Sequence, residues 1–482
     1  MFINREKEIV RLQQALSRET PQLIAVYGRR RCGKSTLLRH ILTDDAIYFA
    51  ADLRESPLQI AALAQQIDKA LPGFSKAIYP DWETILSSLN QSLRQRTSLC
   101  IDEFPYLVKH SPELPSVIQK IVDSNARQNL NIILCGSAQQ MMHGMALESS
   151  SPLYGRCNEV LRIEPMKICH MARYLNVSAV EAVKEFAVWG GVPRYWEIRK
   201  QEDSFQQALK HHVLDQYGIL YEESERLFAD EMRTSVQAFS VLSLIGSGCH
   251  RTSEIAGRLG KPATQLSRLL AFLTELGYIR REIPFGESIR STKKSLYKLN
   301  DPFLNFYFTF LVPNKSRLEY GLVDQVWKEL SGQLDNYLSG QWETICRSAI
   351  PFMEIEGKRF YPAARWWGSG INGKPMEIDL IAGATDKSTL LVGEVKWSKK
   401  DSAAEINRLL DHKISNMPFI GDQRVIKAIF LKNKAATTFQ DSIIFDPGDV
   451  IQAIGEGEER RQTKSSTFDV RSSRLKKKKK RK

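Results

Sequence analysis

Short apolar runs alternate with amphipathic stretches over the amino-terminal part of this 482-residue chain. Apolar runs of four to eight residues, separated by helical patterns, are typical of the buried strands of a parallel α/β sheet. We therefore predict a parallel α/β domain over residues 1–165, followed by a helical segment without strands over residues 166–235. The predicted strands are Leu23 to Tyr27, Ala46 to Ala50, Ser98 to Ile101 and Asn131 to Cys135.

The pattern changes in the second half of the chain. Residues 236–320 predict two short helices, Arg251 to Gly260 and Ala263 to Leu276, and then a hairpin of residues 278–283 and 295–299. This order is typical of a winged helix. Residues 325–450 return to a mixed α/β pattern. Residues 455–482 are rich in Glu, Arg, Ser and Lys, and we expect them to be unstructured.

Composition narrows the class of protein. Hydrophobic residues make up 43% and charged residues 26% of the chain, as in globular proteins. No apolar run approaches the roughly 20 residues that span a bilayer, and the first residues lack an apolar signal core. Seven cysteines without a CxxC pair predict neither a disulfide framework nor a zinc site. We expect a cytoplasmic protein that does not associate with membranes.

The net charge is +13, of which the last nine residues, Arg474 to Lys482, supply +8. A run of like charges cannot bury apolar area and is expected to be disordered. It attracts phosphate polymers by releasing their counterions, which favours DNA as a partner, or it is a solvated tail without function. Such a run confers no sequence specificity in either case.

The first apolar run leads into a glycine-rich turn that matches the pattern GxxxxGK[ST], and a helical stretch follows it. Such a turn points backbone N–H groups at phosphates, while its lysine reaches the β- and γ-phosphates and its hydroxyl binds Mg²⁺. We predict an ATP site of Gly28, Arg29, Arg30, Arg31, Cys32, Gly33, Lys34, Ser35 and Thr36. The three arginines either add positive field or are simply solvated.

A P-loop needs a second acid on a neighbouring strand. The run before Asp102 and Glu103 supplies it, with Asp102 expected to hold Mg²⁺ beside Ser35 and Glu103 expected to act as general base. Ser137 follows the next predicted strand. It is a candidate contact to the γ-phosphate, or else it caps a turn.

Two arginines are further candidates for the nucleotide site. Arg156 could act as an arginine finger, within its own chain or toward a neighbouring copy, which would imply a homo-oligomer. Arg194 follows a Gly-Gly-Val-Pro turn in the helical segment and could contact the nucleotide. A surface ion pair is the alternative for each arginine.

The ordered motifs Phe2-x-x-Arg5-Glu6, GRRRxGKS, IDEFPYL, GSA, PLYGR and GGVPRY resemble the archaeal-type ATPase family. That family belongs to the AAA+/STAND-like group of P-loop NTPases, so the resemblance implies an ATP-hydrolysing α/β core with a helical lid. Cys32 departs from the small or β-branched residue that many members carry, which leaves phosphate binding unaffected.

The predicted winged helix carries residues suited to DNA. Its second helix offers hydroxyl, amide and guanidinium groups for the major groove, and its hairpin offers cations. Winged helices also serve as protein contacts or as a lid on a nucleotide site. The candidates are Thr264, Gln265, Ser267 and Arg268 on the helix, with Arg280, Arg281, Arg290, Lys293 and Lys294 on the hairpin.

Two apolar runs near the carboxyl end carry acids. Asp379 lies in one and Glu394-x-Lys396 in the other, while Glu343 lies on an earlier predicted helix. Alternate residues of a strand share a face, so these groups can cluster around Mg²⁺ or Mn²⁺, with Lys396 assisting hydrolysis of a phosphodiester. The order resembles the PD-(D/E)xK nuclease superfamily, except that the acid strand reads Met376-Glu377-Ile378-Asp379 instead of beginning Pro-Asp. Many such domains bind without cutting.

The predicted architecture is a P-loop α/β sheet with a helical lid, a winged helix and a restriction-endonuclease-like α/β domain. The first functional hypothesis is an ATPase that controls a DNA-directed, metal-dependent nuclease-like module. The second is a STAND-like nucleotide switch whose C-terminal domain binds DNA or protein without cutting. A third is an ATPase that acts only on protein partners.

Overall fold

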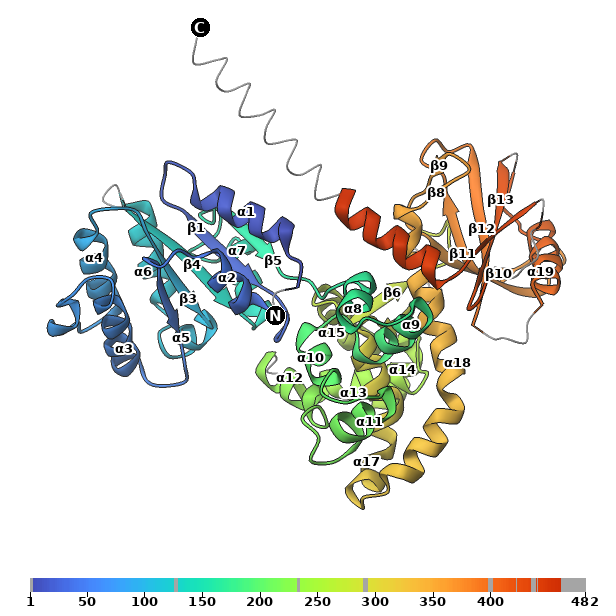
Figure 1. Ribbon diagram of the computed structural model, residues 1–482, viewed down its shortest axis with the longest axis horizontal. Helices are drawn as coiled ribbons and strands as arrows, with labels where there is room; N and C mark the ends of the chain where they lie inside the picture. The colour runs from blue at the N-terminus through green and yellow to red at the C-terminus, as the bar shows by residue number, and fades with distance from the viewer. Residues whose placement is uncertain are drawn as a thin grey trace, which may run out of the picture. The chain divides into compact units, whose positions relative to one another are not determined.

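The computed structural model describes residues 3–124, 129–231, 235–288, 294–397, 402–421, 423–434, 439 and 441–460. These residues form two compact units, one of residues 3–165 and one of residues 166–229 and 235–460 (Figure 1). The division at residue 165 coincides with the predicted end of the α/β domain. Among the described residues, no helix is both long and apolar enough to cross a membrane.

The first unit is built on a five-stranded parallel sheet with the order β2-β3-β4-β1-β5. All four predicted strands are present, whereas the short β5 was not predicted. Contrary to the prediction of neighbouring strands, β1 and β3 are separated by β4. The strands are β1 (Leu23–Tyr27), β2 (Ile47–Ala50), β3 (Thr97–Asp102), β4 (Leu130–Gly136) and β5 (Glu159–Arg162).

Helices connect and cover these strands, because parallel strands need crossover connections. Every residue of β1 and β4 is buried, as expected for central strands covered on both faces. Since all five strands are parallel, the carboxyl ends of β1, β3 and β4 lie at one edge of the sheet. The helices are α1 (Glu6–Leu16), α2 (Lys34–Ile41), α3 (Ser56–Asp68), η1 (Phe74–Lys76), α4 (Trp82–Ser92), α5 (Phe104–His110), α6 (Leu114–Asp123) and α7 (Gln139–Leu147).

The second unit begins with helices, as predicted for this segment. α9 starts at a capping box in which Ser178 and Glu181 satisfy each other's backbone N–H groups. The segment also contains a π-helix, which the sequence pattern did not predict. The elements are α8 (Ile168–Leu175), α9 (Ala179–Trp189), α10 (Pro193–Arg199), α11 (Phe205–Leu209), η2 (Lys210–Leu214) and α12 (Glu223–Glu231).

Two short helices and a hairpin follow, in the predicted order. Gly260 ends the first of them with φ 60°, a left-handed conformation that glycine adopts without strain. A second π-helix lies beyond the hairpin. The elements are α13 (Ser235–Gly246), α14 (Thr252–Leu259), α15 (Ala263–Glu275), β6 (Ile279–Glu282), β7 (Leu296–Leu299), α16 (Pro302–Phe306), η3 (Tyr307–Leu311) and α17 (Val312–Glu319).

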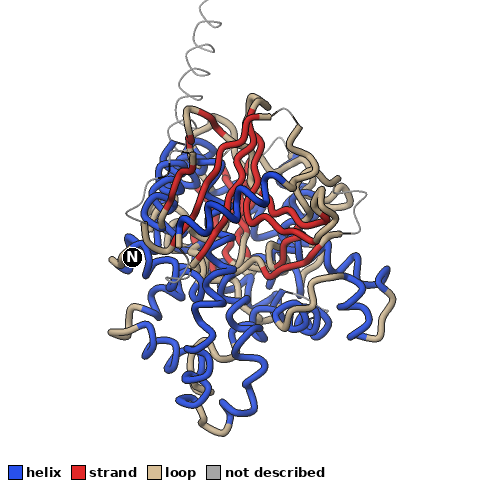
Figure 2. Tube along the Cα trace, turned by 90° about the vertical axis from the view of Figure 1, so that its right-hand side faces the viewer, coloured by secondary structure: helices blue, strands red, loops and turns tan. Residues whose placement is uncertain are grey.

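The C-terminal part contains a second five-stranded sheet, with the order β10-β11-β12-β13-β14. β11 is antiparallel to its two neighbours, β10 and β12, whereas β13 and β14 run parallel to β12. Figure 2 shows the twisted strands of this sheet facing the viewer. Its elements are α18 (Val323–Ala349), η4 (Ile350–Phe352), β8 (Glu354–Ile355), β9 (Lys358–Arg359), β10 (Ala364–Ser369), β11 (Pro375–Gly383), β12 (Thr389–Lys396), α19 (Ala403–Ser415), β13 (Arg424–Leu431) and β14 (Ser442–Phe445).

The expectation of an unstructured segment from residue 455 onward is wrong at its beginning. Residues 447–460 form one helix, in which Ile454 is buried. An apolar residue with a place in the core stabilises a helix that its charged neighbours alone would not predict. The Lys-rich run of residues 474–482 lies outside the described residues.

The long helix α18 joins the two parts of the second unit. It packs against α9 in the helical part and against β11 and β12 in the C-terminal sheet. Its apolar side recurs at Val326, Leu330, Leu334 and Leu338, which is the spacing of one helix face. Polar residues on the same helix thereby come to lie between the hairpin and the sheet.

Candidate functional site

The glycine-rich turn closes around its own lysine. Lys34 is 5% exposed, and its ammonium donates to the carbonyls of Gly28 (2.8 Å) and Arg29 (3.1 Å). Gly28 has φ 150°, and a Cβ on it would overlap the carbonyl oxygen of Ile163. Gly33 has φ 85° directly before α2. The two glycines therefore permit the tight curl that a P-loop requires.

The remaining residues of the predicted cradle differ in exposure. Arg29 and Cys32 are buried, Arg31 is half-buried, and Arg30 and Thr36 are exposed. Arg5, which lies outside the motif, is 8% exposed and donates from Nη2 to the carbonyl of Cys32 at 3.0 Å. A residue from the start of the chain thus braces the turn.

Asp102 lies at the carboxyl end of β3, 5% exposed and surrounded by neutral donors. Burial raises the pKa of this carboxyl group, but hydrogen bonds with Ser35, Tyr48 and Cys135 outweigh burial, so the pKa is lowered. The carboxylate therefore stays ionised and lies beside the Ser35 hydroxyl. These two oxygen donors suit Mg²⁺, as the sequence predicts.

Glu103 and Ser137 meet at the same edge of the sheet. The Ser137 hydroxyl donates to Glu103 at 2.9 Å from Oε2, and its backbone N–H lies 3.2 Å from the same oxygen. Glu103 has φ 54°, a left-handed conformation that is unusual for this residue type and is associated with functional sites. β4 places Ser137 between the P-loop strand and the acid strand, which explains the contact.

Arg156 lies at the opposite edge of the sheet from the P-loop of its own chain. The N–H of Asn158, two residues further on, donates to Leu23, the first residue of β1, whereas the P-loop follows the last residue of β1. Arg156 pairs with Asp123 at the end of α6, with Nη2 2.8 Å from the carboxylate. The parallel topology therefore separates Arg156 from the phosphates that its own chain binds.

Arg194 belongs to the second unit, at the start of α10. Its Nη1 lies 2.7 Å from Glu197, one turn along the same helix. The side chain is 45% exposed. The local structure therefore contains the surface ion pair that the sequence left open as an alternative.

The second cluster of predicted site residues consists of Glu343, Asp379, Glu394 and Lys396, here called the quartet. The Lys396 ammonium lies 2.6 Å from Glu394 and 3.2 Å from Asp379. Asp379 also accepts from the backbone N–H of Val395 at 3.0 Å. The second unit thus brings the acid strand and the Glu-x-Lys strand together as the sequence predicts.

Glu343 joins the quartet from α18. Burial raises the pKa of Glu343, and the charge of Asp379 raises it further, so the two carboxylates are close enough to interact. Arg347, one turn along α18, lies 3.3 Å from Glu343 and donates to the backbone oxygen of Asp379 at 2.8 Å. Glu377, the other acid of β11, pairs instead with Arg365.

The quartet does not fit a resident metal ion in this arrangement. Glu394 is 1% exposed, and Lys413 of α19 lies 2.8 and 2.7 Å from its two carboxylate oxygens. With Lys396 added, two ammonium groups neutralise the acids that a cation would need. In the described part of the chain, no group of three His, Cys, Asp or Glu residues could hold a metal.

The candidate DNA-contacting residues divide into two groups. Thr264, Gln265, Ser267 and Arg268 are exposed along one side of α15, and Arg281 and Lys294 are exposed at the hairpin. Arg280 instead points toward α18, where it bonds to Thr344 at 3.2 Å. Arg290 and Lys293 lie outside the described residues.

Sequence reasoning missed several residues of these sites. Tyr48 hydrogen-bonds to Asp102 and lies on β2, and only the strand order shows that β2 is the neighbour of β3. The contact of Lys413 with Glu394 was not predictable, because it depends on the placement of α19 over the face of β12 that carries Glu394. Arg347 could have been found, because it stands four residues after Glu343 on a predicted helix.

Comparison with protein families gives two matches. Residues 2–195 match an ATPase domain found predominantly in archaea. Residues 307–407 match a domain of archaeal and bacterial proteins of unknown function. The two matches fall in different parts of the chain, and the second says nothing about nuclease chemistry.

One full-length relative is the uncharacterized protein MJECL04 of Methanocaldococcus jannaschii. It is 31% identical over 455 residues, which cover 92% of this chain and 99% of the relative. The similarity therefore extends through both units.

Solved structures with a similar fold include the Walker-type ATPase of Pyrococcus abyssi, at 22% identity and a TM-score of 0.47, covering 64% of this chain and 96% of that one. Another is the ORC2 protein of Aeropyrum pernix, at 14% identity and a TM-score of 0.42, covering 68% and 94%. At these scores neither likeness bears on the function of this chain.

Proposed function

Since the chain belongs to a family of ATPases found predominantly in archaea, we propose that it hydrolyses ATP with Mg²⁺ and uses its second unit to bind DNA. The observation that carries the first part is the meeting of Ser35, Asp102, Glu103 and Ser137 beside the P-loop. Backbone N–H groups and Lys34 suit the phosphates, and Ser35 and Asp102 suit the ion. Mg²⁺ would supply charge neutralisation at the phosphates.

Glu103 would accept a proton from water at its carboxylate, and Ser137 would hold that carboxylate in place. Lys34 is already desolvated and bonded to backbone carbonyls, so a phosphate would replace weak acceptors with a charged one. The test is ATP turnover by the purified protein with Mg²⁺ and with EDTA. Turnover that is equal in both would contradict the proposed ion requirement.

Arg156 would act toward a second copy of the chain. Its position at the far edge of its own sheet, with an exposed ion pair to Asp123, supports delivery to a neighbouring P-loop. Turnover per molecule should then rise with protein concentration, and Arg156→Ala should abolish that rise. A turnover number independent of concentration in the wild-type protein would remove this part of the proposal.

DNA binding is supported by the exposed side of α15 and by the basic hairpin. Thr264, Gln265 and Arg268 provide the donors that a major groove accepts, and Arg281 provides a phosphate contact. The apolar side of that helix, with Leu266, Leu269 and Leu270, is buried against the unit. The polar side is therefore free of a packing role.

The test of DNA binding uses a variant without residues 461–482, because the Lys-rich run would bind any DNA. Affinity for a labelled duplex should fall with salt, and Arg281→Ala should lower the slope of log K against log salt by about 0.9. Lys328→Ala, an exposed lysine on α18, is the matched control. Binding that is absent at low salt would leave protein partners as the targets of the ATPase.

Metal-dependent DNA cleavage by the quartet is a second candidate function. One observation favours it: Glu343, Asp379, Glu394 and Lys396 converge in the order of the PD-(D/E)xK superfamily. The ion pairs of Lys396 and Lys413 oppose it, because they occupy Glu394. Without cleavage, the quartet stabilises a domain that binds DNA as a regulator.

Incubation with plasmid and single-stranded DNA decides between these two functions. Cleavage with Mg²⁺ or Mn²⁺ that Asp379→Ala abolishes, in a preparation whose circular dichroism spectrum matches that of wild type, would establish the nuclease. Intact DNA under every condition, together with salt-sensitive binding, would establish the non-cleaving regulator. ATP should be present in a parallel set, because the first unit could control either outcome.

A further inference from the structure

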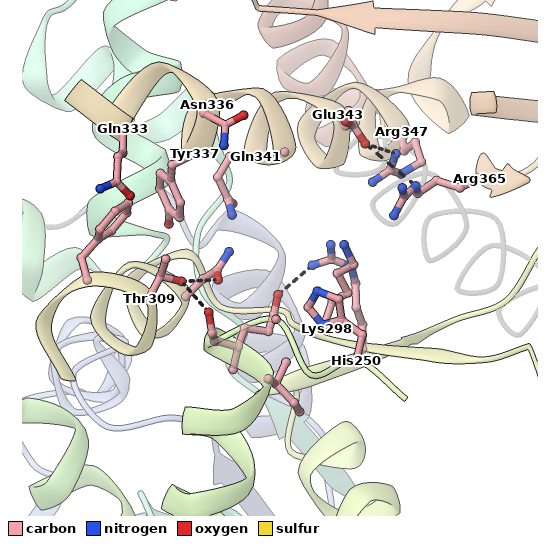
Figure 3. Close-up of a pocket in the computed structure, with 18 residues that line it drawn as sticks. His250, Lys298, Thr309, Gln333, Asn336, Tyr337, Gln341, Glu343, Arg347 and Arg365 are labelled. Carbon is pink, nitrogen blue, oxygen red and sulfur yellow. Dashed lines mark hydrogen bonds and ion pairs between the residues drawn. The ribbon is translucent and has the colours of Figure 1, made fainter. Parts of the chain in front are cut away.

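A polar cavity of about 410 Å³ lies inside the second unit, between α18 and the β6–β7 hairpin. In Figure 3, Gln333, Tyr337 and Gln341 project from α18 on one side, and Lys298 and His250 lie on the other. Glu343, which belongs to the quartet, and Arg347 line its end. Neither the P-loop nor the proposed DNA-contacting side of α15 includes this cavity.

Positive charge dominates the cavity. Four cationic side chains line it: Arg280, Lys298, Arg347 and Arg365. Three carboxylates oppose them: Glu343 in the lining, Glu282, which lies 2.8 Å from Arg280 and 3.3 Å from Arg365, and Glu377, which pairs with Arg365. Four cations against three anions leave an excess of one positive charge in a half-buried place, where uncompensated charge is costly.

Lys298 is the least favourably placed of the four cations. It stands directly opposite Arg280 in the hairpin, and like charges in that relation destabilise a sheet. Within the described residues, no hydrogen bond or ion pair reaches its ammonium group. Burial lowers the pKa of Lys298, and the charge of Arg365 lowers it further. A bound anion would remove each of these penalties.

Arg365 adds a second unused donor. Its Nη groups pair with Glu282 and Glu377, while its Nε is buried and makes no hydrogen bond. The Glu343 carboxylate is 4.0 Å from that Nε, beyond hydrogen-bonding distance. A buried donor without an acceptor calls for an explanation. An oxygen atom of a bound ligand would be the missing acceptor.

The remaining lining specifies more than a simple anion. Asn336 and Gln341 of α18 carry amide groups that make no hydrogen bond within the described residues, and Gln333 carries a third. Amides pair with the edges of nucleobases, and a cavity of this volume matches a ligand of nucleotide size. Charge at one end and amides at the other thus match a phosphate and a base.

We propose that this cavity binds the phosphate of a nucleotide, with Lys298 and Arg365 on the phosphate and the α18 amides on the base. The nucleotide is either the end of a DNA strand or a free mononucleotide, and both present the same phosphate monoester. If the nucleotide is the end of a DNA strand, the inference rests on the proposed DNA binding. If it is a free mononucleotide, the inference is independent of that proposal.

The test measures the acetylation rate of individual lysines by mass spectrometry in the full-length protein. The probes are a short DNA strand with a 5′-phosphate, AMP, and adenosine as the compound without phosphate. Lys298 should react about fivefold more slowly with a phosphorylated probe, since charged hydrogen bonds would hold its ammonium. Lys328, exposed on α18 and outside the cavity, should not change and serves as the control.

Protection by the DNA strand alone identifies a strand end, and protection by AMP identifies a free nucleotide. Equal protection by adenosine, or none by any probe, overturns the proposal. If the protein binds DNA but Lys298 stays unprotected, the cavity inference fails and the proposed function stands. If AMP protects Lys298 but the protein does not bind DNA, the cavity inference stands and the proposed DNA binding fails.

Two matched variants provide a second measurement. Lys298→Gln should weaken binding of the protecting probe about tenfold, because one charged contact is lost. Its thermal midpoint should be unchanged or higher, since removal of Lys298 relieves repulsion from Arg280. Lys328→Gln, at an exposed position of α18 outside the cavity, should leave binding of that probe unchanged. Equal losses in both variants would show a general charge effect and overturn the site.

Discussion

The P-loop site and the quartet both bury carboxylates beside a lysine, but they neutralise them in different ways. At the P-loop, Asp102 is held by the neutral donors Ser35 and Tyr48, and Lys34 is bonded to backbone carbonyls. At the quartet, Glu394 is held by the ammonium groups of Lys396 and Lys413. The first site keeps its negative and positive charges apart and available, whereas the second has already paired them.

Because of this difference, we expect mutations at the two sites to have different consequences. Charges that await a ligand affect activity, because their partners arrive with the substrate. Charges that are already paired affect stability, because removal of one partner leaves the other buried alone. The comparison therefore predicts that acids of the first site can be replaced with little loss of folding, and those of the second cannot.

The largest effect is expected at Glu103. Glu103→Gln should lower ATP turnover by about a thousandfold, because the amide cannot accept the proton from water. The thermal midpoint should stay within a few degrees of wild type, since Gln can still accept from Ser137. Turnover assays and calorimetry on the same preparation measure both. A stability loss as large as that of Glu394→Ala would erase the distinction between the two sites.

The next largest effect is expected at Glu394. Glu394→Ala should lower the free energy of unfolding of the second unit by about 3 kcal/mol, because Lys396 and Lys413 lose their shared partner. Chemical denaturation measures the change, and Glu405→Ala on the exposed side of α19 is the matched control. Unchanged stability would mean that the lysines find water or another acid, and that the quartet is more open than its ion pairs indicate.

A smaller effect follows from Glu282, which stands behind the cationic cavity. Burial raises its pKa, but Arg280, Arg347 and Arg365 outweigh burial and lower the pKa from 4.5 to about 2. A lowered pKa stabilises the folded state above the unfolded value and loses that contribution as pH falls toward 2. Between pH 6 and pH 3.5 the loss should be about 1 kcal/mol.

Urea denaturation at several pH values measures this loss, and Glu282→Gln should remove it from the pH profile. The comparison is between slopes, because the variant also leaves arginines unpaired. An identical pH dependence in variant and wild type would show that other carboxylates account for the acid sensitivity.

The smallest effect is expected at Arg5. Arg5→Ala removes the charged hydrogen bond to the Cys32 carbonyl and should raise the KM for ATP about fivefold, with kcat little changed. Arg11→Ala is the control, because Arg11 lies on the same stretch of chain and pairs with Glu159 at the surface. Equal effects in both variants would show that α1 as a whole, and not the brace on the P-loop, is responsible.

The sequence was sufficient to predict the P-loop, because its functional residues lie close together in the chain. Gly28, Gly33 and Lys34 lie within eight residues, and the apolar run before them specifies a central strand. The partners of Asp102 were not predictable in the same way. Tyr48 reaches Asp102 only because β2 lies beside β3, and strand order is not written in any single segment.

The second unit shows the same limit more strongly. The order Glu343, Asp379, Glu394, Lys396 predicted which groups meet, but not that Lys413 would neutralise Glu394 from α19. The cavity depends on α18, whose residues lie far in sequence from Lys298. The sequence predicted a helix around Glu343. What the polar side of α18 faces is determined by its packing against the helical part and against the C-terminal sheet.

The most direct test of the central claim is ATP turnover with Mg²⁺ by purified wild-type protein and by Lys34→Ala. Wild type should hydrolyse ATP, and Lys34→Ala should fall to the rate of the buffer, because the phosphates lose their cation. Lys109→Ala, an exposed lysine of α5, should match wild type. Wild-type turnover in Lys34→Ala would contradict the assignment of the P-loop as the site of hydrolysis.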